Sequence, residues 1–91
     1  MEESKKNEIM YNLKALSESW IENNKKNIGD VKDFYVAFSD GNGKEFLRTG
    51  PFENSDDISE SMFEHIYDDD TYNISLYCEN INIGKLIVNK C

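Results

Sequence analysis

The sequence has little cysteine, histidine and proline, and these shortages exclude several kinds of protein. Of its 91 residues, two are Cys, one is His and one is Pro. Two cysteines, Cys78 and Cys91, cannot form the disulfide framework of a small secreted domain. Together with His65 they lack the close paired spacing of a zinc site. The chain is therefore expected to be a reduced intracellular protein that needs no metal.

Long apolar runs are also missing. Runs such as Leu86–Val88 are far shorter than the stretch that spans a bilayer. No apolar segment follows the charged start of the chain, so no secretion signal is expected. Asn, Ile and Lys, which have AT-rich codons, occur 11, nine and nine times, against two Ala and one Arg. This usage favours a low-GC bacterium or one of its phages or plasmids, and the cytoplasm of a bacterial host as the location.

Basic residues are scarce, and their distribution is uneven. The net charge is -8, which excludes the simplest nucleic-acid binders because such a surface repels phosphate. Residues 1–48 carry nine acids and eight bases, whereas residues 49–84 carry nine acids and no base. Nearly all the excess negative charge therefore belongs to one 36-residue stretch.

The first segment has helical periodicity. Apolar residues recur at spacings of three and four from Ile9 through Leu13 and Leu16 to Trp20, which predicts a helix over about residues 5–27. Ser4 is the expected cap of this helix. The apolar stripe is expected to face the core, with a dimerising or partner-binding helix as the alternative.

The remaining segments predict two hairpins with a helix between them. Strand alternation around the turn at residues 40–43 predicts a hairpin over about 31–49, closed by Gly50-Pro51. A second helix is expected over about 56–67, capped by Ser55 or Asp57. Alternation around a turn at residues 80–82 predicts the last hairpin, over about 72–89.

These elements predict one small α+β domain covering residues 1–91. Their order is α-β-β-α-β-β, and the two hairpins are expected to form a four-stranded antiparallel sheet with both helices on one face. The other face, which carries Tyr35 and Tyr77, is expected to remain open to solvent.

The sequence carries no catalytic signature, so an enzyme and a cofactor are not expected. His65 is interpreted as a structural or exposed helix residue, since no oriented neighbour or nucleophile is marked. Cys78 is interpreted as a buried thiol on the apolar side of a strand. The acidic triplet Asp68–Asp70 is expected to form a solvated turn or a functional surface, with weak divalent-cation binding as a minor alternative.

The excess acids are expected to form a ridge on and around the second helix. Asp57, Glu60 and Glu64 are spaced by three and four residues, so they share one helix face. Aromatic anchors are available in Phe52, Phe63, Tyr67 and Tyr72, of which Phe63 and Tyr72 are expected to be buried in the core. The candidate partner-binding residues are Glu53, Asp56, Asp57, Glu60, Glu64, Asp68, Asp69 and Asp70.

The favoured function is that of a non-enzymatic inhibitor which binds a basic, nucleic-acid-binding protein without binding nucleic acid or membrane itself. Spaced carboxylates can occupy the positions of phosphates in a basic groove and speed association with it. In kind, this resembles the small acidic proteins of phages and mobile elements, including anti-CRISPR and anti-restriction proteins. The alternatives are an immunity protein or antitoxin that neutralises a cognate toxin, a homodimeric assembly module, and an acidic surface that only keeps the protein in solution.

Overall fold

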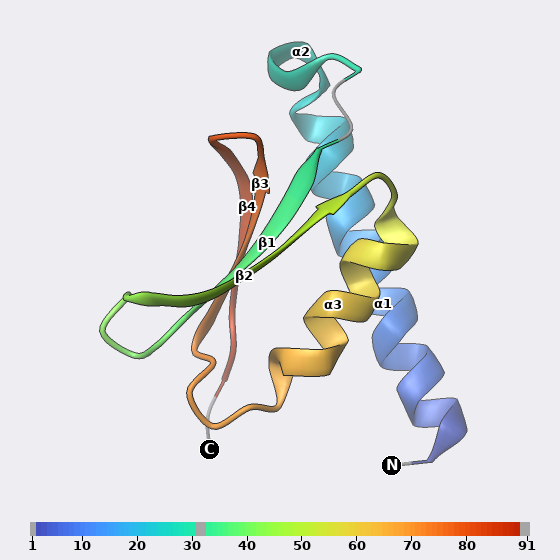
Figure 1. Cartoon of the computed structure of the whole chain (residues 1–91). Helices are drawn as coiled ribbons and strands as arrows, with labels where there is room; N and C mark the ends of the chain where they lie inside the picture. Colours follow the sequence, from blue (N-terminus) through green and yellow to red (C-terminus); the bar gives the residue numbers. More distant parts are fainter. Residues whose placement is uncertain (1, 31–32, 90–91) are drawn as a thin grey trace.

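The computed structural model describes residues 2–30 and 33–89, and it has the expected α+β architecture (Figure 1). The predicted order α-β-β-α-β-β is confirmed, with one additional short helix after the first. The elements are α1 (Glu3–Asn23), α2 (Lys25–Ile28), β1 (Phe34–Ser39), β2 (Glu45–Phe52), α3 (Ser55–Ile66), β3 (Asn73–Cys78) and β4 (Ile81–Ile87).

The four strands form one antiparallel sheet in the order β2-β1-β3-β4. The two hairpins meet through their first strands, because β1 and β3 pair without a break from Phe34↔Cys78 to Ser39↔Asn73. Strands β2 and β4 are consequently the two edges of the sheet. This arrangement places residues from both halves of the chain side by side at the centre.

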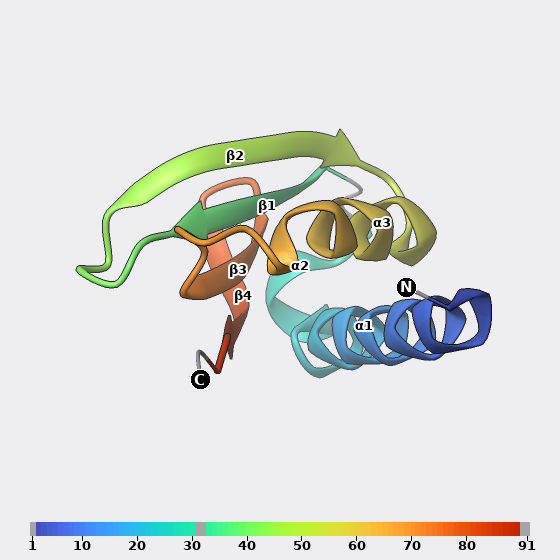
Figure 2. The ribbon, with the colours of Figure 1, turned by 90° about the horizontal axis from the view of Figure 1, so that it is seen from below.

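Helices α1 and α3 pack on the same face of the sheet, as Figure 2 shows. Helix α3 lies against β1 and β2, and α1 lies beside α3 and reaches β4. A short hydrogen bond, 2.6 Å between the hydroxyl groups of Thr49 and Ser61, joins β2 to α3. Helix α3 is thus covered by the sheet on one side and by α1 on another. Its remaining side faces outward and forms part of the molecular surface next to α1.

The core lies between the inner sheet face and the two helices. Strand alternation places Phe34, Val36, Phe38, Ile74, Leu76 and Cys78 on the inner sheet face, and helical spacing places Leu13, Ile58 and Met62 on the inner helix faces; all of these are buried. Ala37 is also buried, although alternation places it with the residues of the other sheet face. Trp20 and Ile9 pack against this core, so the core-facing interpretation of the first stripe holds for them. The buried apolar residues are Leu13, Ile28, Phe34, Val36, Ala37, Phe38, Ile58, Met62, Ile74, Leu76, Cys78 and Ile83.

The first helix differs from the prediction at both ends. Its N-cap is Glu2, which makes no side-chain cap hydrogen bond, and Ser4 lies inside the helix, so the predicted Ser4 cap is wrong. Asn24 interrupts the helix because its side-chain amide donates to the carbonyl of Trp20 (2.8 Å) and to that of Ile83 on β4 (3.1 Å). The chain then forms α2, which ends at Gly29, where φ is 63°.

The hairpin boundaries also differ from the prediction. Val31 and Lys32, placed in the first hairpin, lie outside the described residues. Strand β2 continues through Gly50-Pro51 to Phe52, because an edge strand needs no ladder N–H from proline. The last turn is formed by Glu79 and Asn80 rather than by residues 80–82, since Cys78 pairs directly with Ile81.

Candidate partner-binding surface

Helix α3 begins at a side-chain cap that the sequence interpretation missed. The Asn54 side-chain oxygen accepts a hydrogen bond of 2.9 Å from the backbone N–H of Asp57. The predicted caps, Ser55 and Asp57, are therefore wrong, and both lie within the helix. Asp56 and Asp57 occupy its first turn, where negative charge is favoured by the helix dipole.

Three carboxylates occupy the outward face of α3. Asp57, Glu60 and Glu64 are exposed, whereas Ile58 and Met62 on the opposite face are completely buried. Within residues 2–30 and 33–89, no base lies at ion-pair distance from any of the three. We call Asp57, Glu60 and Glu64 the α3 ridge. Its charges are therefore available to a partner.

Asp56 is exposed like the ridge residues, but unlike them it is paired with a base. Its carboxylate forms a 2.9 Å ion pair with the Lys14 ammonium of α1. The hydrogen bond and the charge of Asp56 raise the pKa of Lys14 above its ordinary value. Asp56 therefore ties α3 to α1, a role that its place in the acidic stretch did not reveal.

The acidic triplet forms the exposed turn after α3. A 2.9 Å hydrogen bond joins the Asp68 carboxylate to Nδ1 of His65, and the backbone N–H of Thr71 donates to the Asp68 carbonyl. Asp69 and Asp70 are exposed. Among the described residues, no group of three or more His, Cys, Asp or Glu side chains is arranged to hold a metal ion.

Two grooves run along the sides of the α3 ridge. The α1–α3 groove, about 650 Å³, is lined by Lys6, Met10, Glu60, Phe63, Glu64 and Tyr67. The β2–α3 groove, about 290 Å³, is lined by Thr49, Phe52, Asp57, Glu60, Ser61 and Glu64. Glu60 and Glu64 line both, so they form the crest that separates two concave surfaces.

The aromatic candidates are distributed differently from the prediction. Phe63 is half-buried in the α1–α3 groove, and Tyr67 beside it is 58% exposed. Tyr72, expected in the core, is 40% exposed and packs next to Gly41, so that expectation is wrong. Phe52 is half-buried at the β2–α3 groove.

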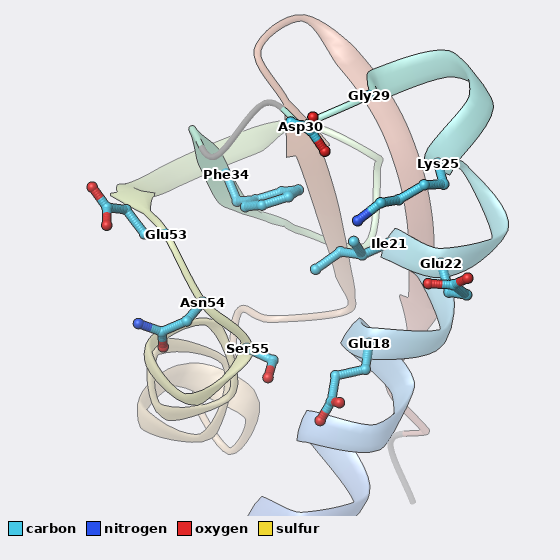
Figure 3. A pocket seen from close by; sticks show the side chains of 10 residues that line it. All are labelled: Glu18, Ile21, Glu22, Lys25, Gly29, Asp30, Phe34, Glu53, Asn54 and Ser55. Carbon is cyan, nitrogen blue, oxygen red and sulfur yellow. The ribbon is translucent and has the colours of Figure 1, made fainter.

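A third concave site, a cleft of about 610 Å³, lies at the other end of α3 (Figure 3). It brings Glu53 together with Glu18, Glu22 and Asp30, which belong to the nearly neutral first half of the sequence. Figure 3 shows the Lys25 side chain extending into this cleft, whereas the Glu53 carboxylate points away from it. The four-residue spacing of Glu18 and Glu22 was a visible signal that they share a face of α1.

The residues considered for catalysis have structural contacts. The His65 ring packs edge-on against Phe38 at 4.9 Å between centroids, besides its hydrogen bond to Asp68. Cys78 is buried as expected, and burial raises the pKa of its thiol, with smaller contributions from the charges of Glu79 and Asp33. Cys91 lies outside the described residues. The raised pKa of Cys78 is the opposite of what an activated thiol nucleophile requires.

Comparison of the chain with protein-family models, with curated proteins and with solved structures finds no match. In the part of the chain that the structure describes, no helix is both long enough and apolar enough to cross a bilayer. The surface chemistry of α3 and its neighbours is therefore the basis for any functional inference.

Proposed function

We propose that this chain is a non-enzymatic binding protein that inhibits a basic, nucleic-acid-binding protein in the bacterial cytoplasm. The observation that carries the proposal is the α3 ridge, three exposed carboxylates with no base within reach among the described residues. The ridge would cover the partner's nucleic-acid site, so inhibition is by exclusion. Mimicry of phosphates by carboxylates supplies the recognition.

The charge of the ridge has a cost inside the molecule that a partner would offset. Like charges at spacings of three and four on a helix destabilise it by roughly 0.2–0.5 kcal/mol per pair. Asp57 with Glu60, and Glu60 with Glu64, are such pairs. A positively charged partner replaces this repulsion with attraction and speeds diffusional encounter.

The shape of the surface also favours docking. Grooves lie on both sides of Glu60 and Glu64, and exposed Tyr67 lies beside them. Tyrosine is enriched at protein interfaces because its ring is apolar and its hydroxyl is polar. A ridge between two grooves can insert its charges into a basic partner while the grooves accept partner side chains.

The test uses the partner captured from a host lysate and then purified. The variant combines Asp57→Asn, Glu60→Gln and Glu64→Gln, and the matched control combines Glu3→Gln, Glu8→Gln and Glu79→Gln, which removes the same charge from exposed positions elsewhere. We expect the ridge variant to bind at least about tenfold more weakly, the control to bind nearly normally, and nucleic acid to compete with the wild-type chain.

Added salt should weaken the wild-type complex, because screening shortens the reach of the ridge charges. Equal losses in the ridge variant and in the control would show that only net charge matters, which is the solubility interpretation. A complex that persists in excess nucleic acid would contradict exclusion at the nucleic-acid site.

A further inference from the structure

The α1–α3 groove has the composition of a receptor for one basic side chain. Its lining combines the aromatic residues Phe63 and Tyr67 with the carboxylates Glu60 and Glu64. We propose that this groove receives an arginine side chain of the basic partner. The inference rests on the proposed function and identifies the group on the partner that this surface recognises.

The rings of Phe63 and Tyr67 provide the apolar part of the receptor. Their centroids are 5.9 Å apart and their planes are nearly perpendicular, at 83°. Tyr67 is 58% exposed, so its ring is accessible to a partner. A guanidinium group stacks on aromatic faces and is attracted by their negative quadrupole. Met10 adds an adaptable apolar wall.

Glu60 and Glu64 provide the charged rim. They lie one helical turn apart on α3, both are exposed, and neither has an ion-pair partner among residues 2–30 and 33–89. Arginine presents a planar fork of N–H donors that matches carboxylate geometry, whereas lysine presents a compact point charge. The combination of stacking surface and carboxylates therefore favours arginine.

Lys6 shows that a cation is attracted to this groove. Its ammonium lies 5.8 Å from the centroid of the Phe63 ring, within the range of a cation–π interaction. Lys6 is exposed in the early part of α1, so it can move away at little cost. With one ammonium against two carboxylates, the groove still carries a net negative charge. Lys6 is thus an internal competitor that a partner's arginine displaces.

The two other concave sites described above lack this combination of accessible rings and unpaired carboxylates. In the Glu18–Glu22 cleft (Figure 3), the aromatic residue is Phe34, which is only 4% exposed and so offers a cation no accessible ring. The β2–α3 groove has the half-buried Phe52 as its aromatic residue and a smaller volume of about 290 Å³. The α1–α3 groove therefore fits a long cationic side chain best among the sites described above.

The test is an NMR titration of the full chain with acetylated tri-arginine amide, and in parallel with tri-lysine amide. We expect saturable shifts of the Met10 methyl, Phe63 and Tyr67 signals with tri-arginine, and at least roughly threefold weaker binding of tri-lysine. Shifts centred elsewhere, or equal affinity for both peptides, would overturn the assignment.

Variants at exposed positions identify the contributing groups. Glu60→Gln with Glu64→Gln should weaken tri-arginine binding roughly threefold to tenfold, and Tyr67→Leu roughly threefold. The matched control, Asp69→Asn with Asp70→Asn, removes the same charge outside the groove and should change affinity by less than about twofold. Lys6→Gln should tighten binding, since it removes the competing cation. Equal losses in the groove variant and the control would overturn the proposal.

The purified partner separates this inference from the proposed function. If Tyr67→Leu binds the partner normally while the ridge variant does not, the arginine receptor is wrong and the inhibitor proposal stands. If tri-arginine occupies the groove but nucleic acid never competes for the partner, the inhibitor proposal fails and the groove chemistry stands.

Discussion

The indole ring of Trp20 lies directly over Gly84, so that a Cβ atom on residue 84 would overlap the ring atoms Cδ2, Cε2 and Cγ. Helix α1 thereby approaches the edge strand β4 at a point where the strand has no side chain. The hydrogen bond from the Asn24 amide to the Ile83 carbonyl lies next to this contact. These two interactions attach the end of α1 to the sheet.

Gly84→Ala is therefore expected to destabilise the fold by about 1–3 kcal/mol, because the indole must move or the strand must shift. The matched control is Gly41→Ala, whose added Cβ would meet the Tyr72 ring at an ordinary 3.7 Å. Urea unfolding measures both. Trp20→Leu combined with Gly84→Ala should lose less than the sum of the single changes. Equal stability of the two alanine variants would refute the overlap.

The cap of α3 gives a second prediction. Asn54→Ala should cost about 1 kcal/mol, because the backbone N–H of Asp57 loses its acceptor. Ser55→Ala, one residue later and inside the helix, should change stability much less. Thermal unfolding of both variants compares them. A larger loss for Ser55→Ala would mean that the cap is assigned to the wrong residue.

The outer sheet face carries a pH-dependent ion pair. Two hydrogen bonds, 2.8 and 3.0 Å, join the Arg48 guanidinium to the Glu45 carboxylate, and Arg48 also lies 4.4 Å from the centroid of the Tyr77 ring. The hydrogen bond from Arg48 lowers the pKa of Glu45 from its ordinary 4.5. The pKa of Glu45 is lower in the folded protein than in the unfolded chain. The pair therefore stabilises the fold at any pH above the unfolded-chain pKa, and this stabilisation is lost as the pH falls through the folded-state pKa.

Glu45→Gln should accordingly be less stable than the wild type at pH 7, by less than about 1 kcal/mol because the pair is partly exposed. The difference should disappear below the lowered pKa of Glu45, on the acid side of 4.5. Urea unfolding at pH 7 and at successively lower pH follows it. A difference that persists unchanged in acid would exclude the ion pair as its cause.

Neutralising Glu60 and neutralising Asp56, both on α3, should change the free energy of unfolding in opposite directions. Glu60→Gln removes repulsion from both Asp57 and Glu64, so it should raise the free energy of unfolding by roughly 0.4–1 kcal/mol, that is, about 0.2–0.5 for each pair. Asp56→Asn should lower it, because Asp56 is paired with Lys14 at 2.9 Å. Denaturant unfolding at low and high salt measures both effects, and salt should reduce each. Stabilisation by both changes would contradict the Lys14 contact.

The Cys78 thiol should react slowly in the folded protein. It is 2% exposed, and burial raises its pKa, so little thiolate is available. In a Cys91→Ser variant, alkylation by iodoacetamide should be slow in buffer and fast in denaturant. Rapid labelling without denaturant would show that the strand end opens readily.

Local patterns in the sequence predicted the two long helices, the four strands and most of the core. The stripe from Ile9 to Trp20 and the alternation through Phe34, Val36 and Phe38 depend on residues close together in the chain, so their periodicity is directly visible. The break at Asn24 was not visible, because one of its acceptors is the carbonyl of Ile83 on a distant strand. The close approach of Trp20 to Gly84 was hidden for the same reason.

The candidate surface was likewise predictable only where it depends on residues close together in the sequence. The shared face of Asp57, Glu60 and Glu64 follows from helical spacing alone. The Lys14–Asp56 pair and the joining of Glu18, Glu22 and Asp30 with Glu53 depend on how α1 lies beside α3. Counting charge along the chain separated Glu18, Glu22 and Asp30 from Glu53, although the fold brings them to one cleft.

The central pairing of β1 with β3 has a consequence for how the chain folds. Each hairpin closes over a short local turn. The pairing of β1 with β3, from Phe34↔Cys78 to Ser39↔Asn73, instead joins strands from opposite halves of the sequence. Bringing such segments together requires the whole of β2 and α3 to be enclosed as a loop, at an entropic cost that contacts repay only afterwards. The rate-limiting event in folding is therefore expected to be the pairing of β1 with β3, which joins two hairpins that have already formed.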